Sequence, residues 1–123
     1  MNNVPAKLRN KWKQEDKDGV VRTCMRAHEG NCQGRLTKEH AFIYAGKQLQ
    51  EEWAILDICA FHHGVDRFQD GGDLNKEVHL WIALNRAPEA RLRELSKAND
   101  YLGIKTRLNA KYGVYEVLEE INL

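Results

Sequence analysis

Long apolar runs are missing from this sequence of 123 residues. No stretch approaches the roughly 18 apolar residues that a membrane-spanning helix needs. Residues 1–13 are polar and basic, unlike the apolar core of a signal peptide, so we expect a soluble, cytoplasmic protein without a membrane partner. Low-complexity tracts are missing too, because Trp, Phe and Tyr are spread along the chain. A chain of this length has enough residues for one core, so residues 1–123 are expected to form a single domain.

Several functional signatures are also missing. The sequence has no glycine-rich phosphate loop, no Gly-x-Ser-x-Gly nucleophile elbow and no internal repeat, which excludes P-loop, α/β-hydrolase and repeat architectures. The net charge is only +1, but residues 1–26 and 86–113 each carry seven Lys or Arg against three acidic residues, whereas residues 27–85 carry five against nine. Basic flanks around an acidic centre suit phosphates at the edges and cations in the middle, although solvated helix faces give the same pattern.

Three cysteines, an odd number, do not make a disulfide framework, and without a secretory signal they are candidate metal ligands. Cys24 and Cys32 are separated by seven residues, and a glycine two positions after Cys32 lets backbone amides turn toward a thiolate. Cys59 and His62 form a C-x-x-H pair. The four side chains make a Cys3His set, which is common at structural zinc sites. His28 is an alternative ligand, and ordinary buried cysteines are the competing interpretation.

The expected order of elements around these ligands is strand, loop, strand, helix. Residues 36–44 have the β-branched and aromatic content of a strand, and residues 53–58 form a second short apolar run. A helix is expected to open at Cys59. The chemically useful side chains on these elements are Glu39 and His40 on the first strand, and His62, His63 and Arg67 on the helix.

The C-terminal half is expected to be helical. Apolar spacing predicts helices over residues 75–85, 88–98 and 102–112. His79 lies within the apolar stripe of the first of these helices, so it is interpreted as a structural histidine. We expect the three helices to pack against the strands and to supply the second basic flank.

This order of residues resembles the HNH family of nucleases, which share the ββα-metal fold. HNH proteins have a Cys pair, then an acidic residue or His followed by His, then C-x-x-C-H where a helix begins. The corresponding residues here are Cys24 and Cys32, then Glu39-His40, then Cys59-Ala60-Phe61-His62-His63. The C-x-x-H-H ending is similar to that of small phage and prophage HNH-type proteins. The resemblance implies an α+β fold, with a zinc-stapled ββα-metal core over about residues 22–70 and a helical extension over about 73–113.

The resemblance further implies a metal-dependent endonuclease that hydrolyses DNA phosphodiester bonds. By their places in the motif, His40 would be the general base, and Glu39 and His63 would hold a catalytic divalent cation such as Mg²⁺, Mn²⁺ or Ni²⁺. A carboxylate and an imidazole suit such an ion and leave water on it, and a neutral imidazole accepts a proton at cellular pH. Strand alternation points Glu39 and His40 to opposite faces, so a twist or bulge is needed to bring them to one site.

Basic residues around the motif are candidate contacts for DNA phosphates, and they are Arg35, Lys38, Lys47 and Arg67. The central Asn of the family would fall near Ala54 and is absent. Its absence favours an alternative function, a zinc-stapled nucleic-acid-binding or recombination-accessory module with weakened cleavage. A protein whose zinc serves folding alone, and whose basic flanks contact another protein, is the third hypothesis.

Overall fold

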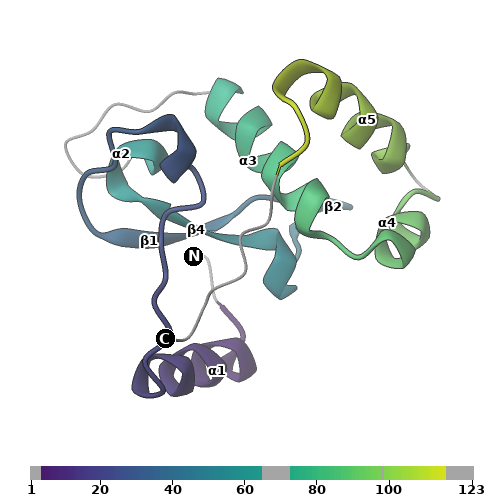
Figure 1. Cartoon of the computed structure of the whole chain (residues 1–123). Helices are drawn as coiled ribbons and strands as arrows, with labels where there is room; N and C mark the ends of the chain where they lie inside the picture. The colour runs from purple at the N-terminus through teal and green to yellow at the C-terminus, as the bar shows by residue number, and fades with distance from the viewer. Residues whose placement is uncertain (1–3, 65–72, 98, 116–123) are drawn as a thin grey trace.

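The computed structural model of the chain describes residues 4–64, 73–97 and 99–115 (Figure 1). Within these ranges it has a mixed α+β architecture, which confirms the predicted class. None of the helices described there is long and apolar enough to cross a membrane. The elements in chain order are α1 (Ala6–Lys17), a 3-10 turn (Ala27–Glu29), β1 (Leu36–His40), β2 (Ile43–Tyr44), β3 (Lys47–Gln48), a second 3-10 turn (Glu52–Ala54), β4 (Ile55–Cys59), α2 (Ala60–His63), α3 (Asp73–Arg86), α4 (Glu89–Leu95) and α5 (Tyr101–Tyr112).

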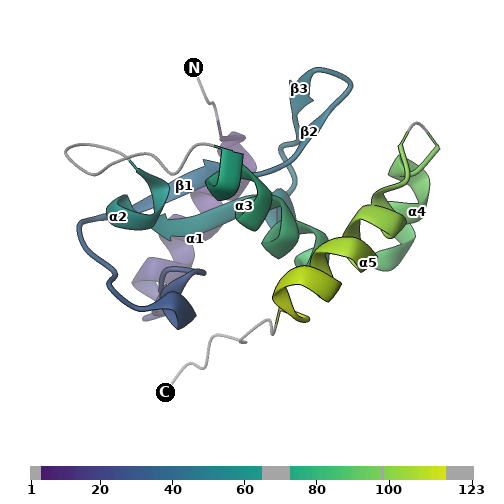
Figure 2. The same ribbon diagram turned by 90° about the horizontal axis from the view of Figure 1, so that it is seen from above.

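The antiparallel pair β1 and β4 lies at the centre, with α1 on one side and α3 on the other (Figures 1 and 2). Thr37 and Glu39 pair with Ile58 and Leu56 of β4, and this face of the pair meets α3. The opposite face carries Lys38, whose ammonium group stacks on the Trp12 ring of α1 at 4.0 Å. Because alternate residues of a strand point to opposite faces, β1 divides its polar side chains between the two layers.

The prediction of one strand over residues 36–44 is wrong in its length, because the chain leaves the first sheet after His40. Phe42 turns into the core, where its ring packs against Trp53 and Tyr101. The chain then forms the separate β2–β3 hairpin, which projects from the β1–β4 pair (Figure 2). Ala45 and Gly46 both have positive φ angles, of 52° and 77°, which is typical of the two-residue turn that joins such strands.

Helix α1 is not among the sequence predictions. Trp12 is its one buried residue, so the apolar periodicity that would reveal the helix is missing. The helix docks through Trp12 Nε1 and Lys11 Nζ, which donate to the Glu52 carboxylate at 3.0 and 2.6 Å. In the C-terminal half, by contrast, α3, α4 and α5 lie within one to three residues of the predicted helices, and they pack a common apolar core against β4.

Candidate metal sites

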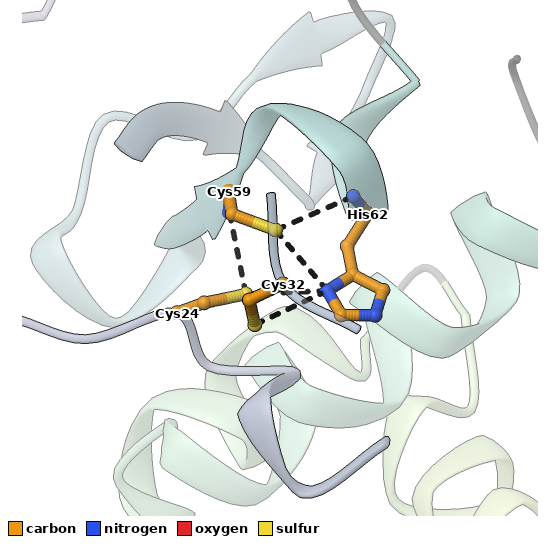
Figure 3. Close-up of side chains that lie close together, drawn as sticks. All are labelled: Cys24, Cys32, Cys59 and His62. Atoms are coloured by element: carbon orange, nitrogen blue, oxygen red, sulfur yellow. Dashed lines mark hydrogen bonds between the residues drawn. The ribbon is translucent and has the colours of Figure 1, made fainter. Parts of the chain in front are cut away.

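Four side chains from separate segments converge beside the end of β4 (Figure 3). Cys24 and Cys32 lie in loops, Cys59 ends β4 and His62 belongs to α2. Their ligand atoms all lie within 4.8 Å of one another. The distances from His62 Nδ1 to the sulfurs of Cys24, Cys32 and Cys59 are 3.6, 3.7 and 3.2 Å. A tetrahedral zinc site separates sulfur and nitrogen ligands by about 3.5 Å, so this group could hold a metal ion such as zinc.

The local backbone of this cluster favours thiolates. The N–H of Cys59 donates to Cys24 Sγ at 3.2 Å, and the N–H of Arg26 donates to the same sulfur at 3.4 Å. Cys59 is in turn the N-cap of α2, because its sulfur accepts the N–H of His62. Gly64 ends this one-turn helix with φ 74°, in the left-handed region. The C-x-x-H spacing therefore places cap and ligand in one tight turn.

The three thiols of this cluster need a cation to be ionised together. Burial raises the pKa of Cys24 to about 12 and also raises the pKa of Cys32. Burial acts in the same direction on Cys59, but hydrogen bonds from backbone N–H groups outweigh it and lower the pKa of that thiol. Burial and the charge of Arg26 lower the pKa of His62, which favours a free lone pair. A bound dication would displace the thiol protons and compensate for the burial of the Cys24 and Cys59 thiolates.

His28 is not part of this cluster. Its ring packs edge-on against Trp81 and Tyr115, with ring centroids 6.0 and 5.9 Å away. The alternative of His28 as a ligand therefore has no geometric support, and its ring instead contacts Trp81 of α3 and Tyr115, which follows α5.

A second cluster lies on the α3 face of β1. Glu39 Oε2 is 3.0 Å from His63 Nε2 and 3.2 Å from His79 Nδ1. The structure thus brings together the predicted ligands Glu39 and His63, from β1 and α2. It adds His79 of α3, which the sequence indicated only as a structural histidine. Glu39 and His63 are 22% and 20% exposed, whereas His79 is 2% exposed. The cluster is therefore open on the Glu39–His63 side and closed behind.

The hydroxyl group of Thr37 decides which nitrogen of His63 carries a hydrogen. Thr37 Oγ1 donates to the Ile58 carbonyl at 2.7 Å and lies 2.6 Å from His63 Nδ1. A hydroxyl has a single hydrogen and a carbonyl only accepts, so Thr37 accepts the hydrogen of His63 Nδ1. In the neutral ring, Nε2 then carries the lone pair and faces the Glu39 carboxylate. Two acceptors at this distance need a cation between them, either a proton or a metal ion.

Glu39 is ionised in this environment. Burial raises the pKa of its carboxyl group, but the hydrogen bonds with His63 and His79 outweigh burial and hold the pKa at about 2. The carboxylate is the form that hard divalent cations bind. A carboxylate and an imidazole nitrogen between which a metal ion could replace the shared proton therefore meet at a partly exposed point of the surface.

His40 is not brought to this cluster. Its Nε2 lies 2.9 Å from Gln50 Oε1, and the ring is buried on the face of β1 opposite Glu39. The alternation that the sequence indicated is therefore present in β1, without a bulge in its register with β4. The role of His40 as a base stays a prediction.

The predicted phosphate contacts are dispersed. Lys38 forms an ion pair with the buried Asp57 and faces α1, away from Glu39. Arg35 immediately precedes β1, and Lys47 is exposed in the β2–β3 hairpin. Arg67 lies outside the described residues. Sequence reasoning missed Thr37, Arg26 and His79 as members of the two sites, because only the folded chain brings them into contact with the ligands.

Comparison of the chain with protein-family models, with curated proteins and with solved structures finds no significant match. The chemistry of the two clusters is thus the basis for a functional assignment.

Proposed function

We propose that this protein is a zinc-stapled, metal-dependent endonuclease that hydrolyses DNA phosphodiester bonds, as its HNH-like motif implies. The observation that carries the proposal is the pair formed by the Glu39 carboxylate and His63 Nε2, 3.0 Å apart and partly open to solvent. Zinc is assigned to Cys24, Cys32, Cys59 and His62 because three thiolates and an imidazole are ligands typical of structural zinc.

Each cluster has a distinct part in the proposal. The Cys3His group ties α2 to the loop before β1, and this tie aims His63, the next residue after His62, at Glu39. Glu39 and His63 would bind one Mg²⁺, Mn²⁺ or Ni²⁺ ion and leave its other positions to water and phosphate. Such an ion neutralises charge on a scissile phosphate and makes bound water more acidic.

The position of His40 supports a second candidate function. The motif assigns the general base to His40, yet this ring is hydrogen-bonded to Gln50 on the other face of β1. Ala54, in place of the family's Asn, is completely buried and has no side chain to orient a base. Both features favour a nucleic-acid-binding or recombination-accessory module in which cleavage is weakened. The two functions share the zinc site and differ in turnover.

Nicking of supercoiled plasmid tests the proposal. Zinc-loaded protein is incubated with plasmid in buffer freed of other divalent cations on a chelating resin, and then with added Mg²⁺, Mn²⁺ or Ni²⁺. We expect ion-dependent nicking that Glu39→Gln and His63→Asn each abolish. Asparagine retains an N–H near Thr37 and lacks the second nitrogen of the ring, so His63→Asn removes a ligand with little change in packing. Matched controls are Glu77→Gln and His28→Asn, which alter the same residue types outside the cluster and should nick like the wild type.

Each other result has a definite meaning. Nicking that survives both ligand substitutions would identify a contaminating nuclease and contradict the proposal. His40→Ala is tested beside them: loss of nicking with an unchanged circular dichroism spectrum supports His40 as the base, and unchanged nicking rules it out. Absence of nicking with every ion, together with DNA binding that weakens steeply with salt, would favour the accessory module.

A further inference from the structure

The Arg26 guanidinium group lies between the two clusters. Its Nε and Nη2 donate to the Glu29 carboxylate at 2.6 and 2.7 Å, which fixes the plane of the group. Its Nη1 donates to the backbone carbonyl of His62 at 3.1 Å and lies 3.3 Å from His79 Nε2. Arg26 is 7% exposed, so these contacts are made away from water. One side chain thus contacts a residue of the Cys3His group and a neighbour of Glu39.

These contacts determine the tautomer of His79. An arginine side chain carries only donors, so His79 Nε2 must accept and has a lone pair. The hydrogen of the neutral ring is then on Nδ1, which is 3.2 Å from Glu39 Oε2. The result is a directed chain in which Arg26 donates to His79 and His79 donates to Glu39. In His63 the arrangement is reversed. Thr37 holds a hydrogen on Nδ1, so the nitrogen that faces Glu39 is Nε2, which can give its lone pair to an ion.

We propose that His79 is a positioning residue of the candidate ion site, held by Arg26, and not a third ligand. Its Nδ1–H orients the Glu39 carboxylate, and the lone pair that a metal ion would need points away, toward Arg26. The two imidazoles that flank one carboxylate oxygen therefore have opposite roles, ligand for His63 and support for His79. This inference rests on the proposed function for the ion that Glu39 and His63 bind.

A physical consequence is that the two clusters are coupled. His62 is a candidate zinc ligand, and its carbonyl is one of the acceptors that hold Arg26. Without Arg26, the hydrogen of the His79 ring could move to Nε2, and Nδ1 would then no longer donate to Glu39. Supporting residues of this kind commonly change metal affinity by roughly 10- to 100-fold.

Nitrogen-15 NMR of the histidine rings tests the tautomers directly in the wild-type, zinc-loaded protein without a second ion. We expect His79 to be neutral with its hydrogen on Nδ1, and His63 to carry a hydrogen on Nδ1. A neutral His79 with the hydrogen on Nε2, or a doubly protonated His79, would overturn the inference whatever the protein's activity.

Binding of Mn²⁺, followed by electron paramagnetic resonance of the free ion, tests the positioning role. Asparagine has an amide nitrogen at the place of Nδ1, so His79→Asn retains a donor for Glu39, whereas His79→Phe retains ring size and loses it. We expect His79→Phe to weaken Mn²⁺ binding by roughly 10- to 100-fold and His79→Asn to stay near the wild type. Equal binding by wild type and a folded His79→Phe variant would overturn the positioning role. Absence of Mn²⁺ binding by the wild type itself would instead contradict the proposed ion site.

Discussion

Thr37 lies between β4 and His63, and its hydroxyl hydrogen is already given to the Ile58 carbonyl. The remaining capacity of the hydroxyl is to accept, and this forces the hydrogen of His63 onto Nδ1. A residue two positions before Glu39 on the same face of β1 thereby determines that the other nitrogen of His63 is available at the candidate site. This effect depends on the hydroxyl group of Thr37 and not on its size. A substitution of equal size can therefore remove the hydrogen bond and keep the packing.

Thr37→Val tests this tautomer control. Valine has nearly the shape of threonine but cannot accept a hydrogen bond, so the hydrogen of His63 is no longer held on Nδ1. We expect Mn²⁺ affinity and plasmid nicking to fall by roughly 10- to 100-fold, with a loss of about 1 kcal/mol in the free energy of unfolding for the hydrogen bond. Thr37→Ser should retain both activities. Thr106→Val, which removes a hydroxyl from the surface of α5, is the matched control, and an equal loss there would contradict the explanation.

The strand and helix elements differ in how far the sequence predicts them. The ligand pairs Cys24–Cys32 and Cys59–His62 are recognisable in the sequence because the two members of each pair lie within a short segment. The helices α3 to α5 are predicted because their apolar residues recur at helical spacing. Helix α1 is not, since a single buried tryptophan leaves no period to detect.

Tertiary contacts explain what the sequence could not predict within the sites. Arg26 and His79 are 53 positions apart, and each alone resembles an ordinary residue, one a surface arginine and the other a buried histidine. Their roles arise only when α3 crosses the β1–β4 pair. Glu39 and His63 were predicted because the motif places them, whereas the orientation of His40 depends on how β1 pairs with β4, which the motif does not specify.

The 3-10 turn before β4 allows a test of the missing asparagine. Ala54 ends this turn, is completely buried, and its carbonyl accepts the N–H of Ala41 at 2.9 Å. We expect Ala54→Asn to lower the free energy of unfolding by about 1–3 kcal/mol in urea titration, because an amide must enter a packed core. Ala90→Asn, on the exposed side of α4, is the control and should cost less than 1 kcal/mol. A stable Ala54→Asn variant with faster nicking would contradict this expectation and restore the family's asparagine to its catalytic place.

At the scale of the whole molecule, the Cys3His group joins the loop between α1 and β1 to the end of β4 and to α2. Cys24 and Cys59 belong to the same apolar cluster as Leu56 and Ile82, so the candidate zinc site is continuous with the core between β4 and α3. Residues 24–35 contain only a single short turn of regular structure. A metal ion bound to Cys24 and Cys32 would therefore stabilise this loop, which packs against one end of the β1–β4 pair.

Removal of zinc is expected to unfold the region around the Cys3His group before the C-terminal helices. Wild-type protein should contain one zinc per chain by elemental analysis; Cys32→Ser and His62→Ala should lose it, and His28→Ala should keep it. The zinc-free proteins should lose amide hydrogen-exchange protection in α2, β1 and β4 before α4 and α5, because the Cys3His group contacts the former elements. Apparent zinc-binding free energies in small domains are on the order of 10 kcal/mol, as large as the stability of a whole domain, so the melting temperature should also fall clearly.

Mn²⁺ binding should disappear with the zinc, because His63 directly follows the zinc ligand His62 and Arg26 donates to the carbonyl of that residue. Zinc-free protein with unchanged protection, or zinc lost only in His28→Ala, would contradict the assignment of these four ligands.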